Sequence, residues 1–231
     1  TSPDSVNESL SKVKAMWPST PIGLLCCNAG VVAQPKRGGS GLGGSTGMLD
    51  STLEDWNFTF GVNVYGVINT LKTYGPVMLQ QERVHSCIVN TSSVAGITTA
   101  SMGPYSVSKH ACAAITEGLY MEMKNSGADE YISVHCLCPA VIATKIFHAE
   151  RNRPDELVSD LDKSSKENKV ATAMKLATQE MYAEEGLSPQ ATAEAAFNQI
   201  SQGFLWLLVD NPPPMQLDIK SSVGRRMGGI L

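Results

Sequence analysis

The chain has 231 residues, of which 42% are hydrophobic and 17% are charged, and its formal net charge is −4 at pH 7. This length fits one α/β domain, and this composition excludes a disordered chain. The negative charge gives no sign of a surface for nucleic acid, and the longest nearly uninterrupted apolar run, residues 22–33, is too short to span a bilayer. No signal peptide is visible. We therefore expect a cytoplasmic protein with no nucleic-acid partner and no membrane span.

Six cysteines occur, and their placement favours reduced thiols over disulfides or a metal site. Five of them lie in strand-like apolar runs and one lies in a helical run, and no Cys-x-x-Cys pair exists. The four histidines have no consistent spacing with Asp, Glu or Cys. The sequence therefore predicts no metal site.

The predicted elements alternate between helices and short apolar strands that are buried on both faces. In chain order we expect a helix over 5–16, a strand over 22–27, a Gly-rich loop over 34–50, a helix from a capping box at 51–54 to about 82, a strand over 86–90, a helix over 103–125, a strand over 132–138, a charged and mostly helical stretch over 145–186, a helix from 189 to 203 that Ser188 caps, and a strand over 204–209. The tail beyond this strand gives no clear pattern. This order predicts an α/β fold with a Rossmann-like, doubly wound parallel sheet.

A proton-transfer site is indicated by Tyr105 and Lys109, which lie four residues apart on one helix and so share a face. A Lys ammonium beside a phenol favours the phenolate, so we expect the pKa of Tyr105 to fall from about 10 toward neutrality. Ser93 arrives from another element, and its hydroxyl can hold the same substrate oxygen. These three side chains predict acid/base chemistry at a carbonyl or alcohol oxygen, but they supply no hydride.

The informative polar residues lie where predicted strands end. Asn28-Ala29-Gly30 ends the first strand, Ser93 follows the second, and the segment Pro139 to Thr144 follows the third. Because ligands of parallel sheets bind at the carboxyl ends of the strands, we expect these residues to meet at one edge.

Five segments in this order resemble the short-chain dehydrogenase/reductase family. They are Asn28-Ala29-Gly30, Asn63-Val-Tyr-Gly66, Asn90-Thr-Ser-Ser93-Val-Ala-Gly96, Tyr105-x-x-x-Lys109 and Pro139-x-x-x-x-Thr144. Each motif alone is weak, but five in order are specific, and the likeness runs from residue 1 to about 210. The resemblance implies a single Rossmann-like domain over 1–231, in which the helical segment 145–186 covers the substrate. It also implies a small alcohol or carbonyl substrate, NAD or NADP as cofactor, and a homo-oligomer.

The resemblance assigns a role to each matching residue. Tyr105 would be the general acid/base, Lys109 would lower its pKa and hold the nicotinamide ribose, and Ser93 would hold the substrate oxygen. Asn63 would sit at a bend in its helix and anchor a water that relays protons to Lys109. Further cofactor contacts would come from Asn28, Ala29, Gly30, Ile142 and Thr144. Thr144 could cap the helix that follows it, instead of or in addition to its cofactor contact, and Ser92 is expected to be structural.

The departures from the family pattern concern the cofactor's phosphates. The family opens with a strand, a Gly-rich turn and a helix, whereas this chain begins about 60 residues later, by the size of a βαβ unit. The G-x-G-x-x-G match at 39–44 follows a loop rather than a strand, so we interpret it as a loop. Ala140 stands where the family usually has Gly. We expect an N-terminally truncated chain with an exposed strand edge, poor dinucleotide binding and little activity alone.

Two alternatives remain open from the sequence. The chain could belong to an NAD(P)-dependent oxidoreductase, or it could be a non-catalytic structural or interaction module of the same fold. The substrate pocket would include Ile97, Met102, Ile146 and Phe147, which favour a medium-sized, partly apolar carbonyl compound. Neither the substrate nor the preference between NAD and NADP can be inferred from these residues.

Overall fold

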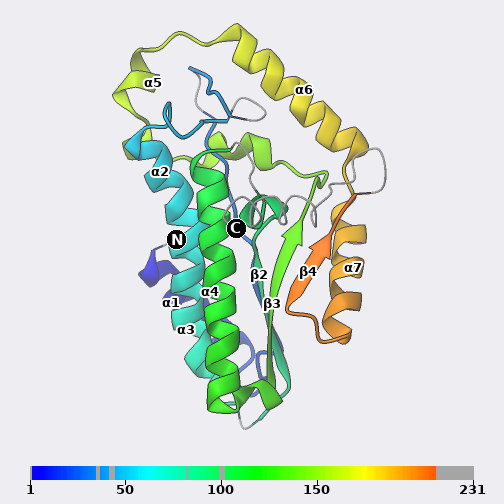
Figure 1. The fold of residues 1–231 in the computed structure, drawn as a ribbon. Coiled ribbons are helices and arrows are strands. Elements are labelled where there is room, and N and C mark those ends of the chain that lie inside the picture. The colour runs from blue at the N-terminus through cyan, green and yellow to red at the C-terminus, as the bar shows by residue number, and fades with distance from the viewer. Residues whose placement is uncertain (1, 35–36, 42–44, 82, 99–101, 212–231) are drawn as a thin grey trace, which may run out of the picture.

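The computed structural model describes residues 2–34, 37–41, 45–81, 83–98 and 102–211 (Figure 1). Four parallel strands form one sheet in the order β1-β2-β3-β4, each beside its predecessor in the chain. Their bounds are Leu24–Cys27 for β1, Ser86–Thr91 for β2, Ile132–Pro139 for β3 and Trp206–Val209 for β4. The register pairs Leu25 with Ile88 and Ile88 with Val134. The predicted α/β fold with a parallel sheet is confirmed.

Helices connect these strands and cover both faces of the sheet. They are α1 (Pro3–Met16), α2 (Leu53–Phe60), the π-helical turn η2 (Gly61–Tyr65), α3 (Gly66–Leu79), η3 (Val94–Gly96), α4 (Pro104–Ser126), η4 (Ala128–Glu130), η5 (Ile146–Asn152), η6 (Asp155–Leu157), α5 (Asp160–Ser164), α6 (Lys169–Glu185) and α7 (Pro189–Ser201). Figure 1 shows α3 and α4 on one side of the sheet and α7 on the other, with α5 and α6 beyond the end toward which the strands point.

Alternation along β2 divides the apolar core between the two faces, as the pleat of a strand requires. Ile88 packs with α3 and α4, whereas the next residue, Val89, packs with Ala196 of α7 and Leu207 of β4. The larger cluster, on the side of α3 and α4, contains Leu25, Cys27, Val67, Met78, Ile88, Cys112, Met123, Ala128, Ile132 and Val134. This core fixes the position of α4 along β2 and β3. The first turn of α4 is therefore held at the carboxyl ends of these strands.

Strand β1 differs from the expectation that it is buried on both faces. Leu25 and Cys27 face the core, but Leu24 is 43% exposed and Cys26 is also exposed. The reason is that α7 packs against β3 and β4 and does not extend across β1. In the described part of the sheet, β1 is an edge strand whose second face is open to solvent.

Several predicted boundaries shift by a few residues. The capping box consists of Thr52 and Asp55, one residue later than predicted, because the Asp55 carboxylate accepts from the Thr52 N–H at 2.9 Å. The long helix that follows ends at Leu79, with η2 as its interruption, and the segment 145–186 contains two short 3-10 turns before α5 and α6. Ser188 caps α7 with Pro189 in the first turn, as predicted. The G-x-G-x-x-G match and the tail extend into residues outside the described ones.

All six cysteines are free thiols, and Cys136 and Cys138 share one face of β3, as their spacing predicts. Among the described residues, no three or more His, Cys, Asp and Glu side chains gather in a way that could hold a metal ion. Within the same residues, no helix combines the length and the apolar character that crossing a membrane requires.

Candidate functional site

A cavity of about 810 Å³ lies at the carboxyl ends of β1, β2 and β3. Its lining contains eight of the nine residues to which the sequence assigned a catalytic or cofactor role, namely Asn28, Ala29, Gly30, Ser93, Tyr105, Lys109, Ile142 and Thr144. The ninth, Asn63, lies behind the lining. Residues from four separate segments of the chain thus meet in one hollow, which is the convergence that the strand ends predict.

Tyr105 lies in the first turn of α4, which begins at Pro104 after Gly103. Gly103 has a φ of +46°, and a side chain there would also collide with the backbone of Thr46, so this position requires glycine. The Tyr105 ring is buried against Val32, Met102 and Phe147. This packing holds the phenol in one position at the cavity wall.

Ser93 follows β2 and lines the same cavity as Tyr105, and its hydroxyl group lowers the pKa of the phenol. Its backbone is extended, and its Oγ accepts from the Ala95 N–H at 3.1 Å, which caps the turn η3. The serine is therefore both the cap of η3 and a polar group at the wall of the cavity. Two hydroxyl groups at one wall of the cavity can hold a single substrate oxygen.

The predicted fall in the pKa of Tyr105 is wrong for this structure. Burial raises the pKa of Tyr105 to about 12, and the neighbouring Ser93 hydroxyl group offsets only part of that rise. Burial also lowers the pKa of Lys109. The sequence argument counted the charge of the ammonium but could not count the loss of solvation at both groups. Tyr105 is thus a protonated phenol at neutral pH in this structure.

Lys109 is 3% exposed, and its Nζ donates to the Thr91 carbonyl oxygen at 2.9 Å. The same Nζ lies 5.7 Å from the centroid of the Tyr105 ring. A Cβ atom at Gly30 would stand 3.2 Å from Nζ, so the amine would have to shift by a few tenths of an ångström to admit it. Gly30 therefore leaves room for Lys109 in its present position.

Asn63 is buried in the π-helical turn η2, at the predicted bend. Its Oδ1 accepts from the Val31 N–H, and its Nδ2 donates to the Val31 carbonyl oxygen and to Ser108 Oγ, each at 2.9 Å. The side-chain amide thus joins the loop after β1 to α4. Its geometry is that of a positioning group, and a role in a proton relay stays a prediction.

Ser92 is structural, as expected, since its Oγ donates to the Lys109 carbonyl oxygen at 2.7 Å. Gly96 allows this close packing, because a Cβ there would lie 2.4 Å from Ser92 Oγ and 2.6 Å from the Lys109 carbonyl oxygen. The end of β2 and the second turn of α4 are therefore locked together. This contact fixes Ser93 relative to Lys109.

The segment after β3 carries Ile142 and Thr144 along the cavity. A short parallel bridge pairs Ile142 with Leu187, and the Asn211 side chain bonds both the N–H and the carbonyl group of Val141. The alternative that Thr144 caps a helix is wrong, because the following turn η5 begins at Ile146 with Lys145 in the cap position. Thr144 is exposed and free to line the cavity.

Part of the cavity wall was not predicted. Tyr182 of α6 lines it and meets Phe147 edge to face, with ring centroids 4.8 Å apart. The only sequence signal was an aromatic residue on a charged helix. Met102, Ile146 and Phe147 line the cavity as predicted, whereas Ile97 does not, because it packs against Cys136 and Cys138 beneath the sheet edge.

Comparison with known proteins identifies the family. The model of the short chain dehydrogenase family matches residues 1–155. The CLA biosynthesis dehydrogenase/reductase of Lactiplantibacillus plantarum is 30% identical over 142 residues, which are 61% of this chain and 45% of that protein. The C alpha-dehydrogenase of a Sphingobium species is 30% identical over 159 residues, which are 68% of this chain and 48% of that protein. The chain spans about half the length of the curated relatives it matches.

Solved structures agree with this match. A short chain dehydrogenase/reductase from Burkholderia phymatum, crystallised with NAD, is 30% identical and superposes with a TM-score of 0.79. The alignment covers 99% of this chain and 73% of that one. A short chain dehydrogenase from Burkholderia cenocepacia, crystallised with NADP, shares the fold at 17% identity and a TM-score of 0.61. By the matched sequence and the shared fold, this chain belongs to the short-chain dehydrogenase family of oxidoreductases.

Proposed function

We propose that the complete protein interconverts an alcohol and a carbonyl compound with NAD or NADP, and that Tyr105 is the general acid/base. The observation that carries this proposal is that Ser93, Tyr105 and Lys109 line one cavity of 810 Å³, in which the Lys109 amine is fixed by the Thr91 carbonyl oxygen. Two hydroxyl groups and a buried amine at the same cavity are the groups needed to exchange a proton with a substrate oxygen.

A nicotinamide cofactor, when bound, would supply the hydride donor or acceptor. The residues present fit its nicotinamide and ribose end. Lys109 is held by Thr91, and the small residues Ala29 and Gly30 keep the cavity open beside it. Ile142 and Thr144 would line the opposite side. The relatives crystallised with NAD and with NADP support the cofactor class without selecting between the two.

The proton chemistry follows from the pKa of Tyr105. With a pKa of about 12, the phenol holds its proton at neutral pH and can donate it to a substrate oxygen during carbonyl reduction. Ser93 would hold that oxygen through its hydroxyl group. In the oxidation direction Tyr105 must accept the proton, and the Lys109 amine, whose Nζ lies 5.7 Å from the centroid of the Tyr105 ring, would favour the phenolate when charged.

The segment 145–186 would cover the substrate. Phe147 and Tyr182 form an aromatic wall beside Tyr105, so the preferred substrate would be partly apolar. The Asn63 side chain would keep the loop after β1 and α4 in register, as a positioning residue.

We also propose that these residues are part of a longer chain. The open face and edge of β1, with exposed Leu24 and Cys26, fit further strands and helices packed against it. The relatives, which are about twice as long as the matched segments, support the same view. A homo-oligomer rests on family likeness alone.

The test uses the complete protein and a panel of alcohols and ketones with each nicotinamide cofactor. We expect NADH or NADPH to bind, with a change in cofactor fluorescence, and turnover to fall about 100-fold in Ser93→Ala while cofactor affinity is retained. The residues 1–231 alone should bind both cofactors poorly. Unchanged turnover in Ser93→Ala would contradict the assigned site, and cofactor binding without turnover of any compound would favour the non-catalytic alternative.

A further inference from the structure

A cluster of five charged side chains lies away from the proton-transfer residues, between the loop after β1 and the segment that covers the cavity. Its members are Arg37, Asp55, Glu150, Arg153 and Asp162. Nothing in the proposed chemistry uses these groups. Because taking charges out of water costs free energy, a cluster this well buried calls for a physical explanation.

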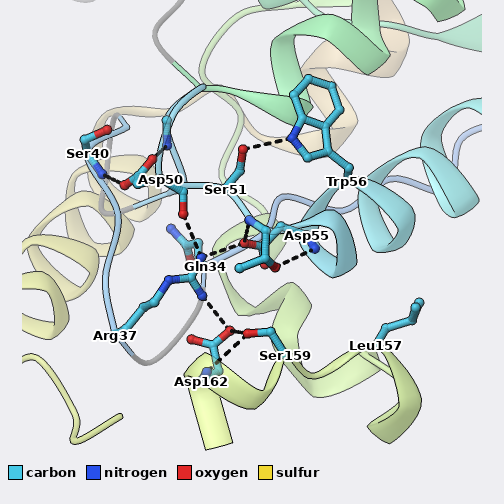
Figure 2. A network of polar contacts seen from close by, with 12 residues as sticks. Gln34, Arg37, Ser40, Asp50, Ser51, Asp55, Trp56, Leu157, Ser159 and Asp162 are labelled. Atoms are coloured by element: carbon cyan, nitrogen blue, oxygen red, sulfur yellow. Dashed lines mark hydrogen bonds and ion pairs between the residues drawn. The ribbon is translucent and has the colours of Figure 1, made fainter. Parts of the chain in front are cut away.

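Asp55 is at the centre of the cluster, and its side chain is fully buried. Its Oδ2 lies 2.7 Å from Arg37 Nη2, and its Oδ1 lies 2.9 Å from Arg153 Nη2. Arg37 reaches on to Asp162 at 2.6 Å, and Arg153 reaches on to Glu150 at 2.7 Å. Figure 2 shows the Arg37 guanidinium between Asp55 and Asp162, with Ser159 beside Asp162.

The five side chains come from four segments that are distant in the chain. Asp55 is in the first turn of α2, Arg37 is in the loop after β1, Glu150 and Arg153 are at the end of η5, and Asp162 is in α5. Two of these segments also have a second contact nearby. Arg37 donates to the Asp50 carbonyl oxygen at 3.0 Å, and the Arg153 guanidinium lies 4.5 Å from the centroid of the Phe58 ring. The cluster therefore ties the start of the covering segment to α2.

This tie reaches the cavity through η5. Glu150 Oε1 accepts from the Gln34 N–H at 2.6 Å, which holds the loop after β1 three residues before Arg37. The same short turn carries Phe147, which is 1% exposed and packs against Tyr105 and Val32. A displacement of η5 would move the aromatic wall that faces the phenol.

The rest of the covering segment has little other attachment. None of the 17 residues of α6 is buried. Its far end is fixed where Leu187 pairs with the strand-like segment at Val141, and its middle contacts Phe147 through Tyr182 and through Gln179 Nε2 at 3.1 Å. At the near end the ion cluster holds α5, and Gly38, the residue after Arg37, lies against Ala171 of α6. A helix without buried apolar residues depends on such end contacts for its position.

We infer that this buried ion cluster positions the substrate-covering segment, residues 145–186, and that Asp162 is the contact that attaches α5. By doing so, the cluster sets the affinity for the substrate rather than the rate of proton transfer. The inference about substrate affinity rests on the proposed function, whereas the inference that the cluster attaches this segment does not.

The first test is hydrogen exchange on the complete protein carrying Asp162→Asn. We expect amide exchange over 145–152 and 169–185 to accelerate at least about tenfold, while exchange over α4 stays within about twofold of wild type. Asp160→Asn is the matched control, since Asp160 is two residues away in the same helix and pairs with Lys163 at the exposed surface, at 3.4 Å. It should change exchange in neither region.

Ser159→Ala is a milder second variant, because Ser159 Oγ donates to Asp162 Oδ2 at 2.9 Å and its removal leaves no unpaired charge. It should give the same pattern of exchange with a smaller amplitude. If amide exchange over α4 accelerated as much as exchange over α6, the cluster would only stabilise the fold. If exchange over α6 stayed unchanged, the cluster would not hold α6 in place. Either result would overturn the inference.

The second test separates KM from kcat on an alcohol from the panel above. Asp162→Asn should raise KM about tenfold with kcat within about threefold of wild type, and Asp162→Glu should recover most of that loss. An equal loss in kcat with KM unchanged would overturn the assignment to substrate affinity. Because hydrogen exchange needs no turnover, a failure of the proposed function leaves the first test intact.

Discussion

Two long helices bring a tyrosine to the same cavity, and they are held in opposite ways. Nine residues of α4 are buried, including Tyr105 and Lys109, whereas no residue of α6, which carries Tyr182, is buried. Proton transfer needs atoms fixed to within a fraction of an ångström, and a helix locked into the core supplies that precision. The helix α6 lines the part of the cavity proposed to admit and enclose substrates, and weaker attachment lets such a helix move.

The locking of α4 depends on polar contacts as well as apolar ones. Its buried Ser108 hydroxyl bonds Asn63, its buried Thr116 hydroxyl accepts from Asn90, and its Lys109 carbonyl oxygen accepts from Ser92. Each contact joins the helix to a different element, namely η2, β2 and the turn after β2. Such bonds specify one register, because a shifted helix would leave these groups buried without partners.

The largest expected effect concerns the attachment of the cover. Arg153→Met should lower the free energy of unfolding by about 3–5 kcal/mol, because it leaves the buried Asp55 and the half-buried Glu150 carboxylates without this cation. Chemical denaturation of the complete protein measures the change. The neighbouring Arg151→Met, which replaces an exposed side chain, should stay within about 0.5 kcal/mol. Equal effects of the two variants would contradict the special role of the cluster.

Replacing the buried amine of α4 should separate stability from activity. Lys109→Met should lower kcat/KM by about 100-fold to 1,000-fold, because both roles proposed for its amine, favouring the phenolate and holding the cofactor, are lost. The free energy of unfolding should be unchanged or higher by up to about 2 kcal/mol, since a desolvated cation is replaced by an apolar chain. Kinetics and denaturation measure the two quantities. A strongly destabilised variant with normal kcat/KM would refute this assignment.

The Asn63 side chain joins the loop after β1 to α4, and its removal tests whether these contacts stabilise the site. Asn63→Ala should lower the free energy of unfolding by about 2 kcal/mol, because the buried N–H and carbonyl groups of Val31 lose their partners. Asn69→Ala in α3, where that side chain is only half-buried, is the comparison. If Asn63→Ala kept its stability but lost activity, the predicted proton relay would explain Asn63 better than positioning does.

The smallest effect is a pH dependence in stability. The pKa of Tyr105 rises from 10.0 to about 12 on folding, so the folded state binds more protons than the unfolded state between these values. Stability contributed by Tyr105 is therefore present below pH 10 and is lost as the pH rises toward 12. Over this window Tyr105→Phe should lose less stability than wild type, by on the order of 1–2 kcal/mol. Identical pH profiles would mean that the phenol is not desolvated as the structure indicates.

The part of the site at the carboxyl ends of the strands was predictable from sequence, because its residues follow strands in the chain. Asn28, Ser93 and Ile142 each stand just after an apolar run, and parallel strands bring such positions to one edge. The same logic gave the order of the elements. It could not give the pKa of Tyr105, since desolvation depends on side chains such as Val32 and Phe147 that pack over the phenol only after folding.

The covering segment, residues 145–186, was predictable only in outline. Its charged composition indicated solvent-exposed helices, which α6 confirms. The ion cluster, however, joins Arg37 to Asp162 across 125 residues and Asp55 to Arg153 across 98, and no local pattern signals such pairs. The shifted capping box has the same cause, since Asp55 serves both the helix start and the cluster. Exposure of Leu24 was missed because an apolar run does not show which face has a covering helix.

The most direct measurement compares two tyrosines at the same cavity, one on each helix. In the complete protein, Tyr105→Phe should lower kcat by at least about 100-fold with cofactor affinity retained, because the proton donor is removed. Tyr182→Phe should leave kcat within about threefold of wild type, since its ring contact with Phe147 is kept. A Tyr105→Phe enzyme with full kcat, or a Tyr182→Phe enzyme with an equal loss, would contradict the assignment of the chemistry to α4.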